Sequence, residues 1–484
     1  MMGKPLERER RFFGHPWQLS SLFQIELWER FSFYGMQGIL LIYLYYQTGE
    51  GGLGIDKAVA GGIVGAYGGS VYLSTILGGW LADRLWGAER TLFYSGMMVM
   101  AGHIALAVIP GLAGLLCGLV LIALGSGGVK ASASSMVGSL YESEELRPLR
   151  DAGFSIFYIS INIGGFLGPL LTGLLQNRLG FHYGFGAAAV GMAFGLLQYA
   201  RGRTSLPPTP APYPLPAGKG KIAAAVAAVL IASLAVAVGA GLINLENFSK
   251  VLLGAVILAT LVYFVRLLGG SGVEAQNKRY ITAYIPLFVV ICIFWALWFQ
   301  VFTSVTVYFD ETANRNIGGF TIPVSWKDSL QSLWVVLFSG LMAAMWTKMG
   351  EKQPKTPLKF ALSVMVLGAS YWCFVPFIAS GAVMPLAVFA LVILGITIAE
   401  LLISPISLSL ATKIAPSHFK TQMVALNFLA LSLGFTLGGL LFKEYFAVET
   451  AASFYRLIGT AGLATGAVLL ALVPVLNRLL KGVD

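Results

Sequence analysis

Residues 201–221 have the sequence RGRTSLPPTPAPYPLPAGKGK, and they interrupt a chain that is otherwise strongly apolar. Proline lacks a backbone N–H and breaks helix interiors, so this tract is predicted to be non-helical and to lie in water. Six long apolar stretches precede the tract and eight follow it. Each is near or above the roughly 20 residues that cross a bilayer as a helix. The sequence therefore predicts an all-α polytopic membrane protein with helices arranged as 6 + 2 + 6.

Helices are predicted for these spans because a bilayer offers backbone polar groups no partner outside the segment itself. The two spans directly after the proline-rich tract contain almost no polar residues, which indicates contact with lipid rather than with a polar pathway. The fourteen predicted helices cover residues 19–47, 57–84, 91–110, 112–140, 150–176, 182–200, 222–244, 250–268, 282–308, 329–347, 358–379, 383–412, 420–445 and 453–476.

The composition excludes a set of soluble domains of the same length. Only 11% of the 484 residues are charged and 57% are hydrophobic, whereas soluble proteins average about 25% charged and roughly 45–50% apolar residues. The net charge is +10, but no basic run alternates with aromatic residues as a nucleic-acid surface requires. We therefore expect the lipid bilayer, and not nucleic acid, as a partner of the chain.

The basic residues predict how the helices are oriented. With a cytoplasmic N-terminus, 23 of the 32 basic residues fall in cytoplasmic segments, 7 fall outside and 2 lie within spans. Lys4, Arg8 and Arg10 belong to the cytoplasmic set. Because lysine and arginine are enriched in cytoplasmic loops, we predict a plasma-membrane protein with both termini in the cytoplasm.

Five charged residues lie inside predicted spans. Glu26, Glu29 and Arg30 share one face of the first helix, since they are three and four residues apart. Lys130 and Glu400 lie in two other spans. Each charge costs about 3 kcal/mol or more at mid-membrane, so these side chains are expected to face a cavity and to have partners. A purely structural ion-pair cluster is one interpretation; a site for a proton and a charged substrate is the one we favour.

Several motifs occur in order along the chain, and together they resemble the proton-dependent oligopeptide transporter (POT) family, bacterial type, of the major facilitator superfamily. The first span contains Glu26-Leu-Trp-Glu29-Arg30-Phe31, like the family's ExxERF motif. The other matching segments are 78–84 (GGWLADR), 125–130 (GSGGVK), 154–164 (FSIFYISINIG) and 399–405 (AELLISP).

The resemblance implies a major facilitator fold and a division of the chain into three parts. Residues 1–200 would form an N-terminal six-helix bundle. Residues 201–279 would hold the cytosolic linker and the two inserted helices, and residues 280–484 would form the C-terminal six-helix bundle. Gly79, Asp83, Arg84 and Arg90 match the superfamily's loop motif. Gly78 and Gly79 would permit close helix approach, while Asp83 and the arginines would link helix ends.

The resemblance also implies symport of di- and tripeptides with protons by alternating access, driven by the proton gradient without a cofactor. Glu26, Glu29 and Arg30 would exchange partners with Lys130 as a carboxyl group gains or loses a proton. Lys130 would also bind the peptide carboxylate, and Glu400 its amino group. The complete predicted substrate-binding set is Tyr34, Gln37, Tyr72, Lys130, Asn162, Trp295, Phe299, Gln331, Glu400, Ser404 and Asn427.

The chain departs from the family pattern at several of these positions. Gln37 stands where the family often has arginine, and Phe299 stands where it often has glutamate. Losing both charges avoids leaving one of them buried and unpaired. We therefore expect the outer gate to close by packing and hydrogen bonds, with no proton role for helix seven. Gln331 and Asn427 replace the usual asparagine and tryptophan, which predicts a side-chain preference shifted towards polar or bulkier residues.

Two alternatives to peptide symport remain at this stage. The chain could move a non-peptide anion or a peptide-like drug, or it could be a membrane receptor or scaffold that does not transport. The sequence contains no nucleotide loop, catalytic triad or metal-ligand cluster, so we expect neither an enzyme nor a metal site. We expect the protein to function as a monomer.

Overall fold

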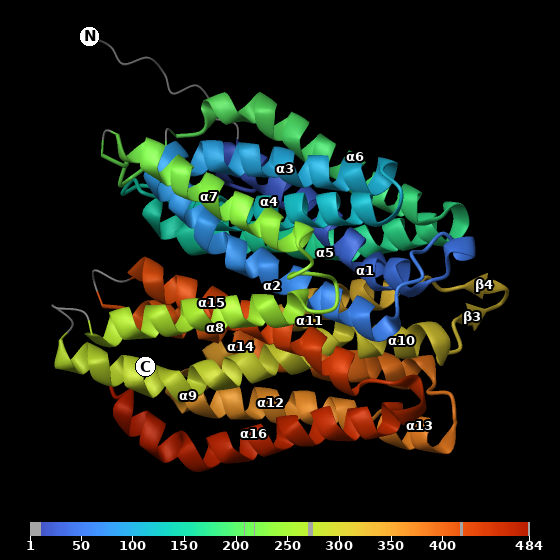
Figure 1. Ribbon diagram of the computed structural model, residues 1–484. Helices are drawn as coiled ribbons and strands as arrows, with labels where there is room; N and C mark the ends of the chain where they lie inside the picture. Colours follow the sequence, from blue (N-terminus) through green and yellow to red (C-terminus); the bar gives the residue numbers. More distant parts are fainter. Residues whose placement is uncertain (1–10, 208, 217, 270–273, 417–419, 483–484) are drawn as a thin grey trace, which may run out of the picture. The chain divides into compact units, whose positions relative to one another are not determined.

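The computed structural model describes residues 11–207, 209–216, 218–269, 274–416 and 420–482, so Lys4, Arg8 and Arg10 lie outside the described residues. These residues form long helices and two short antiparallel hairpins (Figure 1). The strands are β1 Arg11–Phe12, β2 His15–Pro16, β3 Asn316–Ile317 and β4 Phe320–Thr321. The helices are α1 Gln18–Tyr45, α2 Lys57–Leu81, α3 Ala88–Val108, α4 Gly111–Ser139, α5 Arg150–Leu179, α6 Phe181–Gly202, α7 Lys219–Gly239, α8 Phe248–Gly269, α9 Ala275–Trp298, α10 Ser304–Glu311, α11 Trp326–Met349, α12 Thr356–Trp372, α13 Val375–Ser380, α14 Leu386–Lys413, α15 Lys420–Tyr445 and α16 Ala451–Leu479.

The all-helical prediction is confirmed. Within the described ranges, fourteen helices are 17 residues or longer, and they lie close to the predicted spans. Twelve helical segments of the described chain are long and apolar enough to cross a membrane by length and composition. The other two long helices are α1 and α6. In α1 the residues Glu26, Glu29 and Arg30 lower the mean hydropathy.

Two predicted helices are interrupted. The span predicted at 282–308 lies within one apolar helical segment, Ala275–Glu311. Inside this segment α9 ends at Trp298, and a 3-10 turn, Phe299–Phe302, separates it from α10. The side chain of Gln300 donates to the backbone oxygens of Ala296 and Gly438 at this turn. The span predicted at 358–379 is divided into α12 and α13 beside Pro376, which cannot donate a backbone hydrogen bond.

The proline-rich tract is shorter than predicted. Helix α6 continues through Gly202, the 3-10 turn Arg203–Ser205 follows it, and α7 already begins at Lys219. The described residues from Leu206 to this point are non-helical, and most of them are at least partly exposed. The absence of backbone donors at the prolines accounts for this non-helical core of the tract.

The chain forms two compact units. Unit 1 contains the described residues up to Ile39 and those of 74–234, and unit 2 contains Leu40–Leu73 and the described residues of 235–482. In unit 1, α3 packs against α4 and α6, and α5 packs against α6. In unit 2, α12 packs against α14 and α16, and α15 packs against α8 and α9. The division of the chain at residues 200 and 280 stays a prediction.

Small residues allow the helices of unit 1 to approach closely. A Cβ at Gly164 of α5 would overlap the Leu27 carbonyl oxygen of α1, so only glycine fits here. Gly78 of α2 lies against Gly128 of α4, where a Cβ would come within 2.5 Å of the Gly128 Cα. At Gly79 the nearest atom would be 4.0 Å away, so the close approach predicted for both glycines occurs at Gly78 alone.

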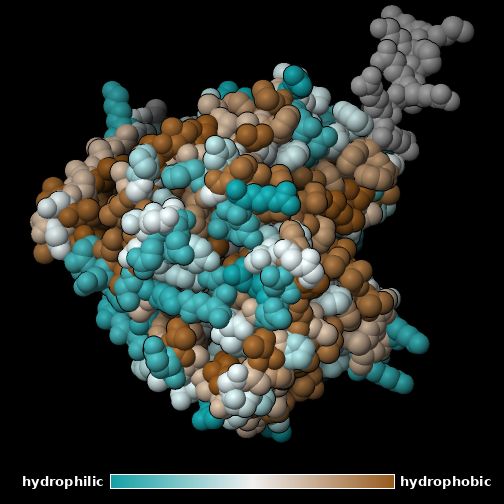
Figure 2. Space-filling model, turned by 90° about the vertical axis from the view of Figure 1, so that its right-hand side faces the viewer, coloured by the Kyte–Doolittle hydropathy of each residue, from teal (hydrophilic) through white to brown (hydrophobic). Residues whose placement is uncertain are grey.

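Apolar side chains cover much of the surface, as contact with lipid requires. Figure 2 looks onto the ends of the helices, and on this face hydrophobic residues lie around a hydrophilic area. Helix α7 has no buried residue, and its exposed side chains include Leu230, Ile231 and Val236. A helix that is apolar on all faces and exposed on all faces needs an apolar environment. This arrangement fits the prediction that the inserted pair contacts lipid.

Candidate functional site

A buried charge cluster joins α1 to α4 in unit 1. Arg30 Nε donates to Glu26 Oε1 at 2.7 Å, and it lies 3.2 Å from Glu29 Oε2. Ser126 Oγ of α4 donates to Glu29 Oε1 at 3.0 Å. Glu26, Glu29 and Arg30 are each at most 6% exposed, so water contributes little to their solvation. The hydrogen bonds described here give the two carboxylates one guanidinium and one hydroxyl as donors.

Lys130 lies one turn after Ser126 on α4, within electrostatic reach of this cluster. It interacts with the charges of Arg30, Glu29 and Glu26. Its Nζ is 4.8 Å from the ring centroid of Phe33, and the same ring lies 6.0 Å from Arg30 Cζ. The structure thus brings all four residues predicted for proton coupling together in unit 1.

The cluster has unused bonding capacity. Glu26 Oε2 is buried and has no hydrogen-bond partner among the described residues. A buried carboxylate oxygen without a partner is costly, and a proton or a shifted cation would satisfy it. Two acids and two bases in mutual reach can therefore change partners when one carboxyl group is protonated.

A carboxylate in unit 2 is held by neutral donors alone. Glu400 of α14 accepts hydrogen bonds at Oε2 from Trp298 Nε1 and from Gln331 Nε2, both at 3.1 Å. No cation among the described residues forms an ion pair with Glu400. Glu400 is partly buried, and carboxylates removed from water are normally paired with a cation. The geometry therefore leaves Glu400 able to bind a cationic group that is not part of the chain.

Aromatic side chains pack beside this carboxylate in unit 2. Phe435 of α15 lies at the centre, with ring centroids 5.1 Å from Tyr72, 5.7 Å from Trp295 and 4.8 Å from Phe299. Trp298 stacks on the same ring at 6.0 Å. Tyr72, Trp295 and Phe299, all predicted as substrate-binding residues, thus meet around a residue that was not predicted.

The remaining predicted residues are placed individually. Tyr34 packs edge-on against Phe33 and interacts electrostatically with Arg30. Asn162 is buried, and its amide donates to the Tyr158 carbonyl of its own helix. Gln37 and Asn427 are buried, and their side-chain oxygens have no hydrogen-bond partner among the described residues. Ser404 lies one turn after Glu400 on α14.

The predicted loop motif contacts the proline-rich tract. Tyr213 and Leu215 donate backbone hydrogen bonds to the carbonyls of Asp83 and Arg84, at 3.0 and 3.1 Å. Arg84 Nη1 donates to the Tyr213 carbonyl at 3.3 Å, and Arg84 Cζ lies 5.7 Å from the Tyr213 ring centroid. Arg90 is exposed. The links of Asp83 and Arg84 described here therefore run to the tract after α6.

A second polar cluster in unit 2 surrounds Asp310, the penultimate residue of α10. Tyr45 and Tyr46 donate hydrogen bonds to its two carboxylate oxygens, at 2.5 and 2.9 Å. Arg315 Nη2 donates to Oδ1 at 2.8 Å. This cluster was not predicted from the sequence, although the Tyr45-Tyr46 pair and the Asp310-Glu311 pair lie at the ends of apolar stretches and could have indicated it.

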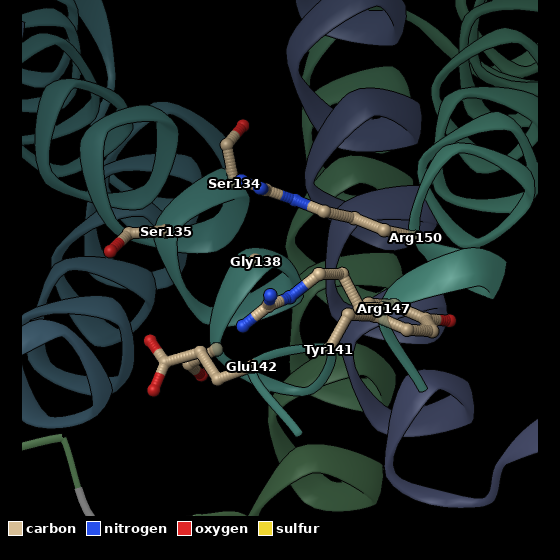
Figure 3. Close-up of a pocket in the computed structure, with 8 residues that line it drawn as sticks. Ser134, Ser135, Gly138, Tyr141, Glu142, Arg147 and Arg150 are labelled. Carbon is tan, nitrogen blue, oxygen red and sulfur yellow. The ribbon is translucent and has the colours of Figure 1, made fainter. Parts of the chain in front are cut away.

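A cavity of about 580 Å³ opens in unit 1 between α4 and α5 (Figure 3). Burial raises the pKa of Tyr141 at its edge, and the Tyr141 hydroxyl is hydrogen-bonded to His15 Nδ1 at 2.8 Å. Tyr141 therefore stays uncharged, and the charged residues of the lining are Glu142, Arg147 and Arg150. The lining contains none of the residues predicted for the site.

Comparison with known proteins places the chain in a family. A model of the POT family matches residues 89–455. The chain belongs to the POT family. The resemblance that the motifs predicted is confirmed, and the chain is a multi-pass membrane protein of a transporter family.

Two relatives and one solved structure match almost the whole chain. The chain is 40% identical to the uncharacterized transporter YclF of Bacillus subtilis (strain 168), covering 98% of this chain and 97% of the relative. It is 39% identical to a di-/tripeptide transporter of Lactococcus lactis subsp. cremoris, covering 98% of each. A crystal structure of peptide transporter POT in complex with sulfate superposes with a TM-score of 0.93, at 40% identity and with 98% of each chain covered.

Three residues that contact predicted site residues were not themselves predicted. Ser126 donates to Glu29, Trp298 donates to Glu400, and Phe435 lies at the centre of the aromatic group. Ser126 could have been found from its spacing, because it precedes Lys130 by one helical turn. Trp298 and Phe435 carried no such signal, since aromatic residues are common in apolar spans.

Proposed function

We propose that this POT protein is a proton-coupled symporter that imports di- and tripeptides by alternating access. The observation that carries the proposal is Glu400, a carboxylate held by two neutral donors with no cation partner among the described residues. A carboxylate in that environment is suited to the ammonium group of a peptide. The relatives named as di-/tripeptide transporters support this substrate class.

The two ends of a peptide require opposite charges. Lys130 binds the peptide carboxylate in the proposed scheme, and Glu400 binds the amino group. The aromatic group around Phe435 provides an uncharged surface for side chains, as binding sites commonly do. A zwitterionic peptide can thus be recognised through its backbone ends, with its side chains contributing to selectivity.

Proton coupling is assigned to the cluster of Glu26, Glu29, Arg30 and Lys130. When a proton neutralises one carboxyl group, Arg30 loses part of its ionic stabilisation and Lys130 gains freedom to change partner. When the proton leaves, the restored carboxylate competes with the peptide carboxylate for Lys130. The exchange makes peptide binding and proton binding depend on each other.

The proposed topology has fourteen spans, which adds α1 and α6 to the twelve apolar helices. The buried charges of α1 face protein instead of lipid, so its lower hydropathy does not prevent it from crossing the membrane. The excess of lysine and arginine in the segments on the same side as the N-terminus supports a plasma-membrane protein with both termini in the cytoplasm. The protein is proposed to act as a monomer.

The outer gate is assigned to the contacts of residues 40–73 with the rest of unit 2. Asp310 with its two tyrosines and Arg315 forms one part, and the ion pair of Lys57 with Glu311 forms another. Ionic contacts therefore add to the packing and hydrogen bonds that the sequence led us to expect. Opening towards the outside requires these contacts to break.

Counterflow in proteoliposomes tests the proposed function. Purified protein is reconstituted with unlabelled dialanine inside, and labelled dialanine is added outside, without and then with an inward proton gradient. We expect exchange in both conditions and net accumulation only with the gradient. Uptake of a labelled non-peptide anion without dialanine exchange would contradict the proposal, as would the absence of any exchange by folded protein.

The indole of Trp298 provides a measurable contribution to peptide recognition. Trp298→Phe removes one of the two donors to Glu400, and a hydrogen bond to a charged group contributes about 1.5–3 kcal/mol. Gln331 still holds the carboxylate, so we expect the KM for dialanine to rise about tenfold. Trp334→Phe is the matched control, because that indole donates to the Ala390 carbonyl instead. Equal KM values for the two variants would contradict the assigned role.

A further inference from the structure

A buried ion pair lies at the start of α11, and the transport scheme above does not use it. Lys327 Nζ donates to Asp328 Oδ1 at 2.6 Å, and the two side chains are 0% and 4% exposed. The charge count from the sequence includes Lys327 among the seven basic residues outside the spans; the structure places it at the second residue of α11, where its side chain is buried. The other oxygen, Asp328 Oδ2, is buried and has no hydrogen-bond partner among the described residues.

The pair contacts the segment where the usual helix-seven acid is missing. Lys327 Nζ lies 5.6 Å from the ring centroid of Phe302. Phe302 ends the 3-10 turn that starts at Phe299, the position where a glutamate is common in the resembling family. This chain therefore has an acid and a base on α11, and they pack against a turn in which Phe299 replaces the glutamate that is common in the family.

The pair is also one helical turn from Gln331, which contacts the carboxylate of Glu400. Gln331 follows Asp328 by three residues and Lys327 by four, so all three lie on one side of α11. Gln331 Nε2 donates to Glu400 Oε2 at 3.1 Å. Gln331 therefore connects the segment that holds the pair to Glu400 within unit 2.

Stability does not account for the pair. Taking two charges out of water costs several kcal/mol per ion, and apolar replacements of a buried pair are often neutral or stabilising. Among the described residues, Lys327 is the only charged group that interacts electrostatically with Asp328, and Asp328 is the only one that interacts with Lys327. The neighbouring turn contributes an aromatic ring, while Glu400 on α14 is engaged by Gln331 and Trp298.

We propose that Asp328, paired with Lys327, is a second proton-carrying site of the transport cycle. The inference rests on the proposed function, since it adds a proton to that symport. A proton from the outer solution bonds to the partnerless Oδ2, and the carboxylate becomes a neutral carboxylic acid. Lys327 keeps its three protons, so the charge of the pair changes from zero to +1. Release of the proton to the cytoplasm restores the carboxylate.

The experiment measures the steady accumulation of dialanine in proteoliposomes at a proton gradient of one pH unit and zero membrane potential. Each coupled proton multiplies the limiting accumulation ratio about tenfold, since one pH unit corresponds to 1.36 kcal/mol. The variant K327Q/D328N removes the titratable pair without leaving an unpaired charge. We expect its limiting ratio to be about tenfold below that of the wild type, with counterflow exchange retained.

Three further variants make the result decisive. K327L/D328M serves as a second neutral variant that favours folding, and Asp328→Glu keeps a carboxyl group and should retain the wild-type ratio. The matched control K250Q/E444Q removes an exposed ion pair of 2.9 Å in the same unit and should also retain it. An unchanged ratio in both neutral variants would overturn the inference while leaving symport intact. A wild type that exchanges no dialanine would instead overturn the proposed function.

Discussion

Replacing Lys130 with alanine is expected to abolish proton-driven accumulation of dipeptide. Lys130 is the cation that the scheme shares between the carboxylates of α1 and the peptide carboxylate. Without it, Arg30 is the cation that Glu26 and Glu29 retain in the cluster, and protonation no longer frees a partner for the peptide. Removing one partner from a buried charge network costs about 3–5 kcal/mol. This cost corresponds to a more than hundredfold decrease in proton-driven accumulation of dipeptide.

The measurement is uptake of labelled dialanine against its gradient at an inward proton gradient. Lys352→Ala changes an exposed lysine and should accumulate peptide as the wild type does. Thermal unfolding of the purified variants confirms that both are folded. A folded Lys130→Ala protein that still concentrates dialanine would refute the coupling scheme.

Replacing Glu400 with glutamine is expected to reduce the affinity for dipeptides that have a free amino group. Glutamine can still be held by Trp298 and Gln331, but it no longer offers a charge to the peptide ammonium. The lost charge pair is worth at least about 2 kcal/mol, so the KM for dialanine should rise at least about thirtyfold.

An N-acetylated dipeptide separates this effect from general damage to the site. It lacks the ammonium group, so its weak competition with dialanine should be the same in the wild type and in Glu400→Gln. Glu351→Gln changes an exposed glutamate and serves as the control for loss of an acid. If Glu400→Gln binds dialanine with unchanged affinity, Glu400 does not recognise the amino group.

The charge cluster of unit 1 could be predicted because charged residues in apolar spans are few and their spacing fixes a helical face. Glu26, Glu29 and Arg30 do form one buried cluster, and Lys130 lies within electrostatic reach of it. The helices could be predicted equally well, because a segment that crosses a bilayer has to be long and apolar. The ends of the non-helical tract were predicted less accurately, because helix propensity alone does not determine where the last helical turn ends.

Other features depend on contacts that a single sequence does not encode locally. The break at Phe299–Thr303 lies in a continuous apolar stretch, and the bonds of Gln300 to Gly438 join residues far apart in the chain. Which of Gly78 and Gly79 meets α4 depends on how α2 is rotated. Lys327 was counted outside the spans because it precedes the span predicted at 329–347, and its buried contact with Asp328, the next residue, has no signal in the sequence.

The most direct test of proton-coupled peptide transport records the internal pH of proteoliposomes while dialanine is added outside. With no initial pH gradient and the membrane potential held at zero, inward movement of peptide should carry protons with it. The account predicts that the lumen acidifies when dialanine is added to wild-type protein, in proportion to the peptide taken up. Dialanine that enters without any acidification would contradict it.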